Sequence, residues 1–149
     1  MVSRYERFTA SISGICRSIQ KIETDEMKSF GLKGSHAQYL AAMDQHPEGL
    51  TASQLCTICE KDKAAVSRAV AELEEKGMIH KENGVYYRAR LTLTPKGREI
   101  SRQVCKKAET AVRLAETNIS KEESHALFAM LDTIAEELRK VCKEGLPEE

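Results

Sequence analysis

The stretch from Asp62 to Lys76 carries side chains that can bind an anionic polymer, spaced along one face of a predicted helix. Its apolar residues recur at steps of three and four, as on a buried helix face: Val66, Ala69, Val70 and Leu73. The opposite face is small, and basic near its start: Lys61, Lys63, Ala64, Ser67, Arg68 and Ala71. A slim, basic helix can enter the major groove of DNA, where Arg, Lys and Ser reach base edges and phosphates. The alternative is that the small side chains pack against another helix.

The residues before this stretch predict a second, shorter helix that would position it. Thr51 and Gln54 have the spacing of a capping box, and the helix that they open ends near Glu60. Asp62 is a suitable N-cap for the following helix. Two short helices joined in this way form a helix-turn-helix pattern. Because a helix N-terminus presents backbone N–H donors, Thr51, Ser53 and Gln54 are predicted to lie near phosphate.

A β-hairpin is predicted directly after the basic helix. Gly77 can end that helix as a C-cap. Met78 to Glu82 then has the pattern of a strand, Asn83-Gly84 is typical of a type I′ turn, and Val85 to Leu93 is the return strand. A hairpin that follows a helix-turn-helix in this way is typical of a wing.

The predicted return strand has two different faces. Its apolar face, which would cover the helix-turn-helix core, contains Tyr87, Ala89, Leu91 and Leu93. Its other face contains Arg88, Arg90 and Thr92. The basic face and the hairpin tip predict contact with a minor groove or with phosphates. The alternative is that the arginines only solvate the outer face.

Long helices are predicted on both sides of this winged segment. They cover residues 5–30, 35–45, 95–118 and 120–145. Ser35 with Gln38 and Ser120 with Glu123 have the spacing of capping boxes. Thr94 precedes a proline, which is typical of an N-cap and the first turn of a helix.

The terminal helices carry apolar stripes that a small winged core cannot cover. The stripe of the first helix contains Phe8, Ile12, Ile15, Ile19 and Ile22. The stripe of the last helix contains Leu127, Met130, Leu131, Ile134, Leu138 and Val141. Large exposed apolar surfaces usually mark an interface. We therefore expect a two-fold homodimer, which would bury both stripes and set two DNA-reading helices about one turn of DNA apart.

The expected fold class is mainly α with a small β-hairpin wing, a winged helix-turn-helix flanked by long terminal helices. We divide it into an N-terminal dimerisation helix (residues 1–34), a winged DNA-binding domain (35–94) and C-terminal dimerisation helices (95–149). The overall formal charge of the 149-residue chain is zero. Lys61 to Arg98, however, holds nine basic against five acidic residues, and Ser120 to the end holds four against eight. This distribution fits an electrostatic footprint confined to the middle of the chain.

The location of the protein is predicted from two absences in the sequence. The chain has no apolar signal segment and no run long enough to span a membrane. Its five cysteines, an odd number, do not suggest the disulfide framework of a secreted domain. We therefore expect a cytoplasmic protein that does not interact with membranes.

Cysteine spacing raises the question of metal or redox chemistry. Cys56-x-x-Cys59 would need two further zinc ligands, which His36 or His46 do not supply at suitable spacing. Both thiols share an apolar helix face, so we interpret them as small buried hydrophobic residues and predict no metal or cofactor. Cys16, beside the apolar stripe of the first helix, is the candidate redox thiol, although its access and pKa decide its reactivity.

No constellation for catalysis appears in the sequence, which has neither a nucleophile elbow nor a phosphate-binding glycine loop. The chain is therefore not predicted to be an enzyme. The rival interpretation from another class is a winged-helix module that binds protein. Salt dependence separates the two, because only DNA binding weakens steeply with salt through counterion release.

The element order and two segments, LEEKGMI (Leu73–Ile79) and LTLTPKG (Leu91–Gly97), resemble the MarR family of transcriptional regulators over nearly the whole chain. This resemblance implies a dimeric winged-helix protein that binds pseudo-palindromic promoter DNA, often as a repressor of its own or neighbouring genes. It implies relief by a small aromatic or phenolic ligand, in a pocket between the winged domain and the dimer region. The peroxide-sensing branch of the family uses a cysteine near the start of the chain, so a thiol-based regulator acting through Cys16 is the alternative.

The wing departs from the family pattern. Many members carry an Asp-x-Arg pair there, whereas this chain reads NGVYYRAR, without the Asp. Arg88 is the first substitute for the family arginine, and Arg90 is the second. The predicted DNA contacts are therefore Thr51, Ser53, Gln54, Lys63, Ala64, Ser67, Arg68, Arg88 and Arg90.

Overall fold

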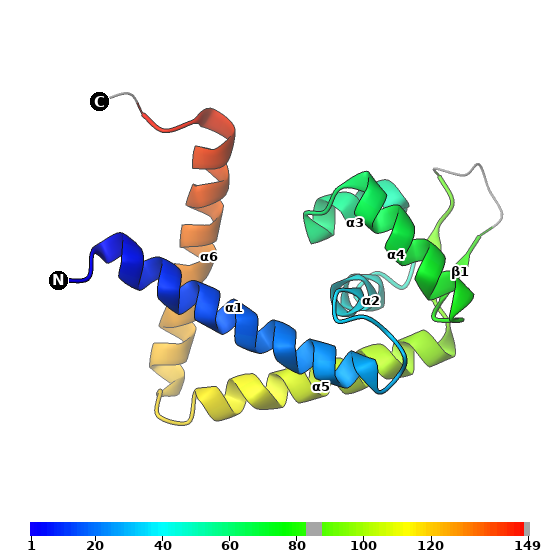
Figure 1. The fold of residues 1–149 in the computed structure, drawn as a ribbon, viewed down its shortest axis with the longest axis horizontal. Coiled ribbons are helices and arrows are strands. Elements are labelled where there is room, and N and C mark those ends of the chain that lie inside the picture. The colour runs from blue at the N-terminus through cyan, green and yellow to red at the C-terminus, as the bar shows by residue number, and fades with distance from the viewer. Residues whose placement is uncertain (83–87, 148–149) are drawn as a thin grey trace. The chain divides into compact units, whose positions relative to one another are not determined.

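The computed structural model describes residues 1–82 and 88–147, which are mainly helical with one short antiparallel hairpin (Figure 1). In chain order its elements are α1 (Arg4–Lys28), α2 (His36–Asp44), α3 (Ala52–Cys59), α4 (Lys63–Glu75), β1 (Ile79–Lys81), β2 (Leu91–Leu93), α5 (Pro95–Ala115) and α6 (Lys121–Glu144). The predicted fold class is thereby confirmed. The chain forms two compact units, Met1–Glu109 and Thr110–Glu149.

The core of the first unit lies where α2, α3, α4 and the hairpin meet. Its most deeply buried side chains are Met27, Leu40, Met43, Leu55, Val66, Leu73, Met78 and Leu91. β1 pairs with β2 so that Ile79 faces Leu93 and Lys81 faces Leu91. Leu91 also exchanges backbone hydrogen bonds with Leu50, which ties the hairpin to the loop before α3. The core therefore holds α4 from both sides, through α3 and through the hairpin.

The two ends of α4 are fixed by local hydrogen bonds. At the start, the Asp62 side chain accepts a hydrogen bond from the Ala65 N–H over 2.7 Å, as predicted. At the other end, Gly77 has a positive φ of 72°, and the Met78 N–H donates to the Leu73 carbonyl over 2.9 Å. This Schellman arrangement turns the chain from the helix into β1.

Thr94 joins the end of the wing to α5. Its hydroxyl donates to the Gly77 carbonyl over 2.6 Å and accepts from the Gly97 N–H over 3.1 Å. A Cβ at Gly97 would overlap the Met78 carbonyl, so only glycine allows this close approach. The predicted N-cap is confirmed, and it anchors α5 to the same turn that ends α4.

Two local predictions need correction. Ser35 does not form a capping box: its backbone is already helical and its side chain makes no capping hydrogen bond. Instead, the buried His36 ring accepts the Lys33 N–H at Nδ1 over 3.3 Å. Among the described residues the return strand covers only Leu91–Leu93, which pair with Ile79–Lys81 of β1, whereas residues 88–90 of the predicted strand lie before it.

Parts of the predicted hairpin cannot be compared with the structure. The Asn83-Gly84 turn, Val85 and Tyr87 lie outside the described residues. On the described side, the predicted alternation holds: Ala89, Leu91 and Leu93 are buried, whereas Arg88 and Arg90 are exposed.

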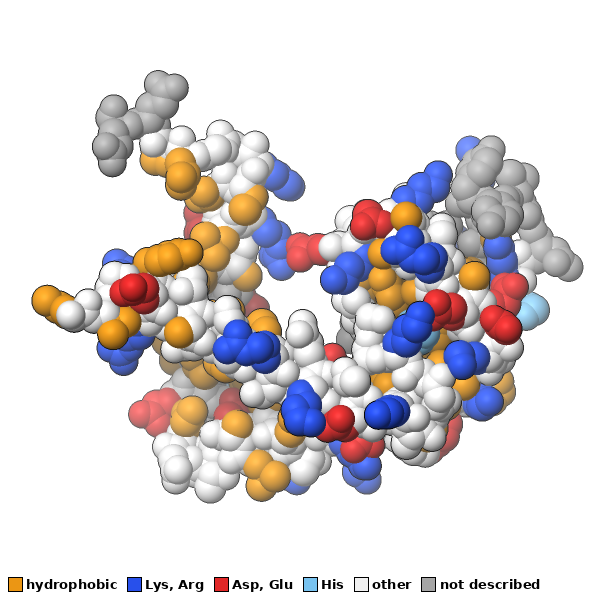
Figure 2. Space-filling view, viewed as in Figure 1, with side chains coloured by type: hydrophobic (Ala, Val, Ile, Leu, Met, Phe, Trp, Pro, Cys, Tyr) orange, Lys and Arg blue, Asp and Glu red, His pale blue; other side chains and the backbone are white. Residues whose placement is uncertain are grey.

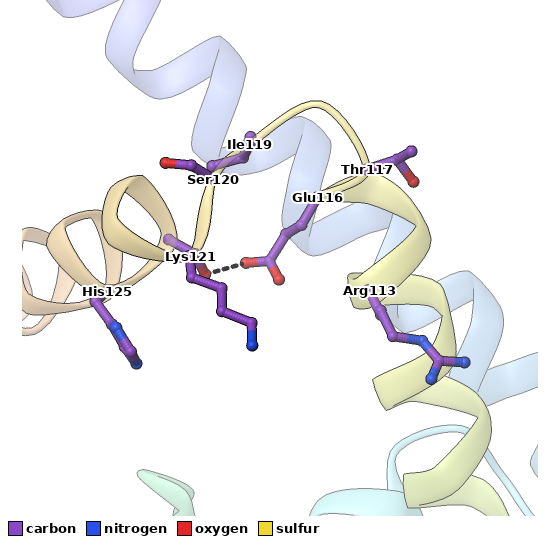
Figure 3. Close-up of a pocket in the computed structure, with 8 residues that line it drawn as sticks. Arg113, Glu116, Thr117, Ile119, Ser120, Lys121 and His125 are labelled. Carbon is purple, nitrogen blue, oxygen red and sulfur yellow. Dashed lines mark hydrogen bonds between the residues drawn. The ribbon is translucent and has the colours of Figure 1, made fainter.

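The second unit contains the end of α5, a turn, and α6. The predicted capping box is confirmed, since the Ser120 hydroxyl accepts from the Glu123 N–H over 3.2 Å and Glu123 accepts from the Ser120 N–H over 2.8 Å. α5 ends at Ala115, slightly before the predicted boundary. A pocket of about 680 Å³ lies at the turn, where Glu116 sits between Arg113 and Lys121 (Figure 3).

α6 has an apolar stripe, yet none of its residues is buried. The exposed members of the stripe include Leu127, Met130, Ile134, Leu138 and Val141. None of the helices in the described part of the chain combines the length and apolar character that a membrane span requires.

Candidate nucleic-acid interface

The outward face of α4 carries the four side chains predicted to enter a DNA groove. Lys63, Ala64, Ser67 and Arg68 are all exposed. The inward face, with Val66, Ala69 and Leu73, is buried as predicted. Figure 2 shows Lys and Arg side chains grouped on the face of the first unit that carries α3 and α4. A helix held by its apolar side thus presents a slim, basic side to the solvent.

The cations on this face of α4 are not neutralised by nearby carboxylates. Among the described residues, neither Lys63 nor Arg68 forms an ion pair. Both can therefore pair with an external anion without breaking an internal contact. Ala64 adds a methyl group beside them, which suits contact with a thymine methyl group.

The start of α3 is organised by its capping box. The Thr51 hydroxyl accepts from the Gln54 N–H over 3.2 Å, and the Gln54 side-chain oxygen accepts from the Thr51 N–H over 2.8 Å. Ser53 and Gln54 are exposed, and Thr51 is half-buried. The Ala52 and Ser53 N–H groups at the helix start, the Ser53 hydroxyl and the Gln54 amide N–H donors can still bind a phosphate.

The two wing arginines are held differently. The Arg90 guanidinium donates to the Glu48 carbonyl over 3.2 Å, so it is tied to the loop before α3. Arg88 lies in a turn and is exposed, and it makes no hydrogen bond or ion pair with the described residues. Gly49 allows the close packing at this point, because a Cβ there would lie 3.1 Å from both Arg90 Cβ and Thr92 Cγ2.

A cluster of polar side chains around Glu72, one helical turn after Arg68 on α4, was missed by the sequence reasoning. Glu72 of α4 accepts from Lys33 Nζ over 2.7 Å and contacts His36 Nε2 at 3.0 Å. Because His36 Nδ1 accepts the Lys33 N–H, its proton sits on Nε2 and the neutral ring donates to Glu72. The cluster ties α4 to the start of α2.

The pKa values of His36 and Glu72, two of the three members of this cluster, are shifted for different reasons. His36 is only 2% exposed, and this burial lowers its pKa, although Glu72 opposes the effect. The hydrogen bond from Lys33 is the main reason why the pKa of Glu72 is lowered. A neutral His36 beside a charged Glu72 therefore forms a fixed hydrogen bond. No sequence signal links these two positions.

The cysteines lie apart from this interface. Cys16 is exposed on α1, while Cys56 and Cys59 are half-buried against the core. Cys59 Sγ lies 3.9 Å from the Gln38 carbonyl, and burial raises the pKa of its thiol. Within residues 1–82 and 88–147 no three metal-binding side chains form a cluster.

A groove of about 490 Å³ runs between α1 and the start of α2. Its walls include Cys16, Ile19 and Glu23 from α1 and Gln38 from α2, and Lys61 closes it near the start of α4. A second groove of about 250 Å³ borders Arg68, and Gln38 and Lys61 line both grooves. A ligand in the first groove would thus touch residues that also border α4.

The structure places all nine predicted DNA contacts in the first unit, on α3, on α4 and at the wing. α3 and α4 pack against each other, and Arg90 is anchored next to the start of α3. These contacts connect α4, the start of α3 and Arg90 within the first unit.

The chain is similar to known proteins in sequence and in fold. Residues 30–84 match the MarR family. A Listeria monocytogenes protein assigned to the MarR family of transcriptional regulators, solved with a 26mer DNA, is 23% identical over 94% of this chain and 96% of that chain, with a TM-score of 0.80. A structure of MarR is 25% identical over 97% of this chain and 99% of that chain, with a TM-score of 0.79.

A third solved structure contains small ligands. Staphylococcus aureus MarR in complex with salicylate and kanamycin is 26% identical over 91% of this chain and 93% of that chain, with a TM-score of 0.79. No curated protein sequence matches the chain.

Proposed function

The chain belongs to the MarR family of DNA-binding transcriptional regulators, and from that premise we propose that it is a homodimeric repressor of its own or neighbouring genes, released from DNA by a small ligand. The family consists of regulators rather than enzymes. The proposal is carried by the face of α4, where Lys63 and Arg68 flank small side chains and form no ion pair with any described residue.

In this proposal each part of the interface has its own task. α4 enters the major groove, where Lys63, Ser67 and Arg68 reach base edges or phosphates. The start of α3 binds the backbone through its free N–H donors. Arg88 and Arg90 contact the minor groove or phosphates beside it. Residues 35–94 form the DNA-binding domain.

The terminal segments, residues 1–34 and 95–149, serve dimerisation in this proposal. On α1 the exposed apolar residues outside the groove include Phe8 and Ile15, and α6 has no buried residue at all. Burying such stripes contributes roughly 25 cal/mol per Å² of apolar surface. A two-fold dimer provides this burial and presents two copies of α4 to a pseudo-palindromic promoter site. A monomeric mass in light scattering at micromolar concentration would contradict the dimer.

Relief by a ligand is supported by the groove between α1 and α2. It is large enough for a small molecule, and two of its lining residues, Gln38 and Lys61, also border the groove beside Arg68. S. aureus MarR, which shares the fold, is known in complex with salicylate and kanamycin. We propose that a small aromatic effector, phenolic or with another polar group, binds in this groove.

The test is a fluorescence-anisotropy titration with the DNA upstream of the protein's own gene and random duplex as competitor. Wild type is compared with Arg68→Ala, which removes the exposed guanidinium of α4. Arg102→Ala serves as the matched control, because it removes an exposed arginine from α5 of the same unit. We expect the Arg68 variant to lose about 1–3 kcal/mol of specific binding and the control to lose little.

The titration is repeated at two salt concentrations. Affinity should fall steeply with salt, because phosphate contacts release counterions. If a folded dimer binds no DNA specifically, the rival interpretation, in which α4 serves a protein partner, becomes the better one.

A second candidate function, thiol-based redox sensing, is favoured by the exposure of Cys16 at the groove. Peroxide would oxidise the Cys16 thiolate to sulfenic acid and release hydroxide. DNA binding should then be lost in wild type and retained in Cys16→Ser after peroxide treatment. Equal sensitivity of the two proteins would exclude Cys16 as the sensor.

A further inference from the structure

The groove between α1 and α2 contains the carboxylate of Glu23, which has no counter-ion among the residues that the structure describes. The side chain is half-buried, and no described residue gives it an ion pair or a hydrogen bond. Burial raises the pKa of Glu23, because the charged form loses part of its hydration. A carboxylate in this state gains more from a cationic partner than a fully hydrated one does.

The other acidic residues of α1 all have partners. Glu6 accepts the Ser3 N–H over 2.7 Å, Asp25 pairs with Lys21 at 2.9 Å, and Glu26 pairs with Lys107 at 2.6 Å. Glu23 differs from them in facing a groove. The other acidic residues of α1 have partners, so the lack of a described partner is specific to Glu23 and to the groove that it faces.

The remaining groove wall suits the rest of a small ligand. Ile19 and Cys16 provide an apolar end on α1, one to two turns before Glu23. Gln20 and Gln38 provide amide groups that can donate or accept hydrogen bonds. A small molecule with an apolar part could thus contact the apolar and the amide side chains of the groove as well as the carboxylate.

Lys61 is the cationic side chain that lines the groove, and it is expected to bind an anionic ligand only weakly. Lys61 is exposed, so its ammonium is hydrated and a pair there contributes little. Glu23, in contrast, has already lost part of its hydration. The electrostatic gain therefore lies on the carboxylate side of the groove.

We propose that the effector of this protein is a small organic cation, whose ammonium group pairs with Glu23 and whose apolar body lies against Ile19. This inference rests on the proposed function, in that it names the chemical class of the ligand that acts on the regulator. A phenol or a carboxylic acid is the competing class, and the experiment separates them.

The experiment compares three probes with the same ring and different charge: benzylamine, benzyl alcohol and benzoate. Binding to the full-length protein is measured by isothermal titration calorimetry and by amide shifts in two-dimensional NMR. We expect benzylamine to bind about tenfold more tightly than benzyl alcohol, as for a hydrogen bond to a charged group. Glu23→Gln, which keeps the shape and removes the charge, should abolish this preference.

Asp25→Asn is the matched control, because it removes one negative charge from the same helix outside the groove. It should leave the benzylamine preference unchanged. As the pH falls, the preference should weaken in wild type, because protonation of Glu23 removes the charge, and Glu23→Gln should show no such change. Thermal unfolding of both variants checks that they are folded.

Three outcomes would overturn the proposal. The first is that benzoate binds more tightly than benzylamine and that Lys61→Gln loses this benzoate binding. The second is that wild type and Glu23→Gln bind benzylamine equally well. The third is that no probe binds. Operator binding is measured on the same samples. If DNA binding depends on Arg68 while no probe binds, the cation site fails and the regulator stands. If benzylamine binds through Glu23 while no DNA is bound, the site stands and the regulator fails.

Discussion

α4 and α6 have the same kind of apolar periodicity, and the structure gives them opposite burial. α4 buries Val66, Ala69 and Leu73 within the first unit. α6 repeats the pattern with larger residues such as Ile134 and Leu138, yet buries none of them. Periodicity therefore shows which face of a helix needs a partner, but not whether that partner lies in the same unit or in a second chain.

The largest effect is expected in α4. Leu73→Ala removes a completely buried side chain and leaves a cavity between α4 and the core. Such substitutions typically cost about 2–5 kcal/mol. Urea unfolding should therefore show a strongly lowered midpoint for this variant. A loss below about 1 kcal/mol would mean that α4 is held mainly by its caps and the cluster around Glu72.

A smaller and different effect is expected in α6. Ile134→Ala should weaken dimerisation by about 2 kcal/mol per protomer if the stripe is buried against a second chain. Analytical ultracentrifugation would show a raised dimer dissociation constant, with the unfolding of the first unit unchanged. Lys140→Ala, at the exposed and charged side of α6, is the control. An unchanged dissociation constant for Ile134→Ala would place the interface elsewhere.

A third prediction concerns the contact that joins α4 to α2. Burial lowers the pKa of His36 below its ordinary value of 6.5, against the opposing effect of Glu72; Lys33 and Lys76 also lower it. The unfolded chain therefore takes up a proton at a pH where the folded protein does not. Stability should fall as the pH drops through about 6.5, and it should continue to fall until the pH reaches the lowered pKa.

His36→Gln should lose most of this dependence, since it cannot be protonated. His80→Gln, which changes an exposed histidine of β1, should retain it. Urea midpoints at about pH 7.5 and about pH 5.5 measure the difference, because the carboxylates stay mostly charged in this window. Equal pH dependence of wild type and His36→Gln would show that folding does not change the pKa of His36.

The sequence predicted those parts of the fold and site that depend on neighbouring residues. The caps at Thr51 and Asp62 follow from a few consecutive residues, and the two faces of α4 follow from the helical period. The link between His36 and Glu72 could not be predicted, because the two residues are far apart in the chain and either type is common on a surface. The Ser35 prediction failed because the backbone at Ser35 is already helical, whereas a capping residue has an extended backbone.

The groove was equally hidden from sequence reasoning. Glu23, Gln38 and Lys61 come from three separate segments, and only the packing of α1 against α2 brings them to one site. A family resemblance suggested where a pocket would lie, but it could not identify the charges that line it. Tertiary packing therefore determines which side chains line the groove, while local sequence determines the two faces of α4.

The smallest effects are expected at the wing, where two exposed arginines differ only in how they are held. Arg90→Ala removes the hydrogen bond to the Glu48 carbonyl and should lower stability by about 0.5–1 kcal/mol. Arg88→Ala should leave stability unchanged, because Arg88 has no described partner. If each contacts one phosphate, each variant should reduce the slope of log affinity against log salt by about 1. A changed slope for Arg88→Ala alone would mean that Arg90 positions the wing and that Arg88 is the arginine that reaches the DNA.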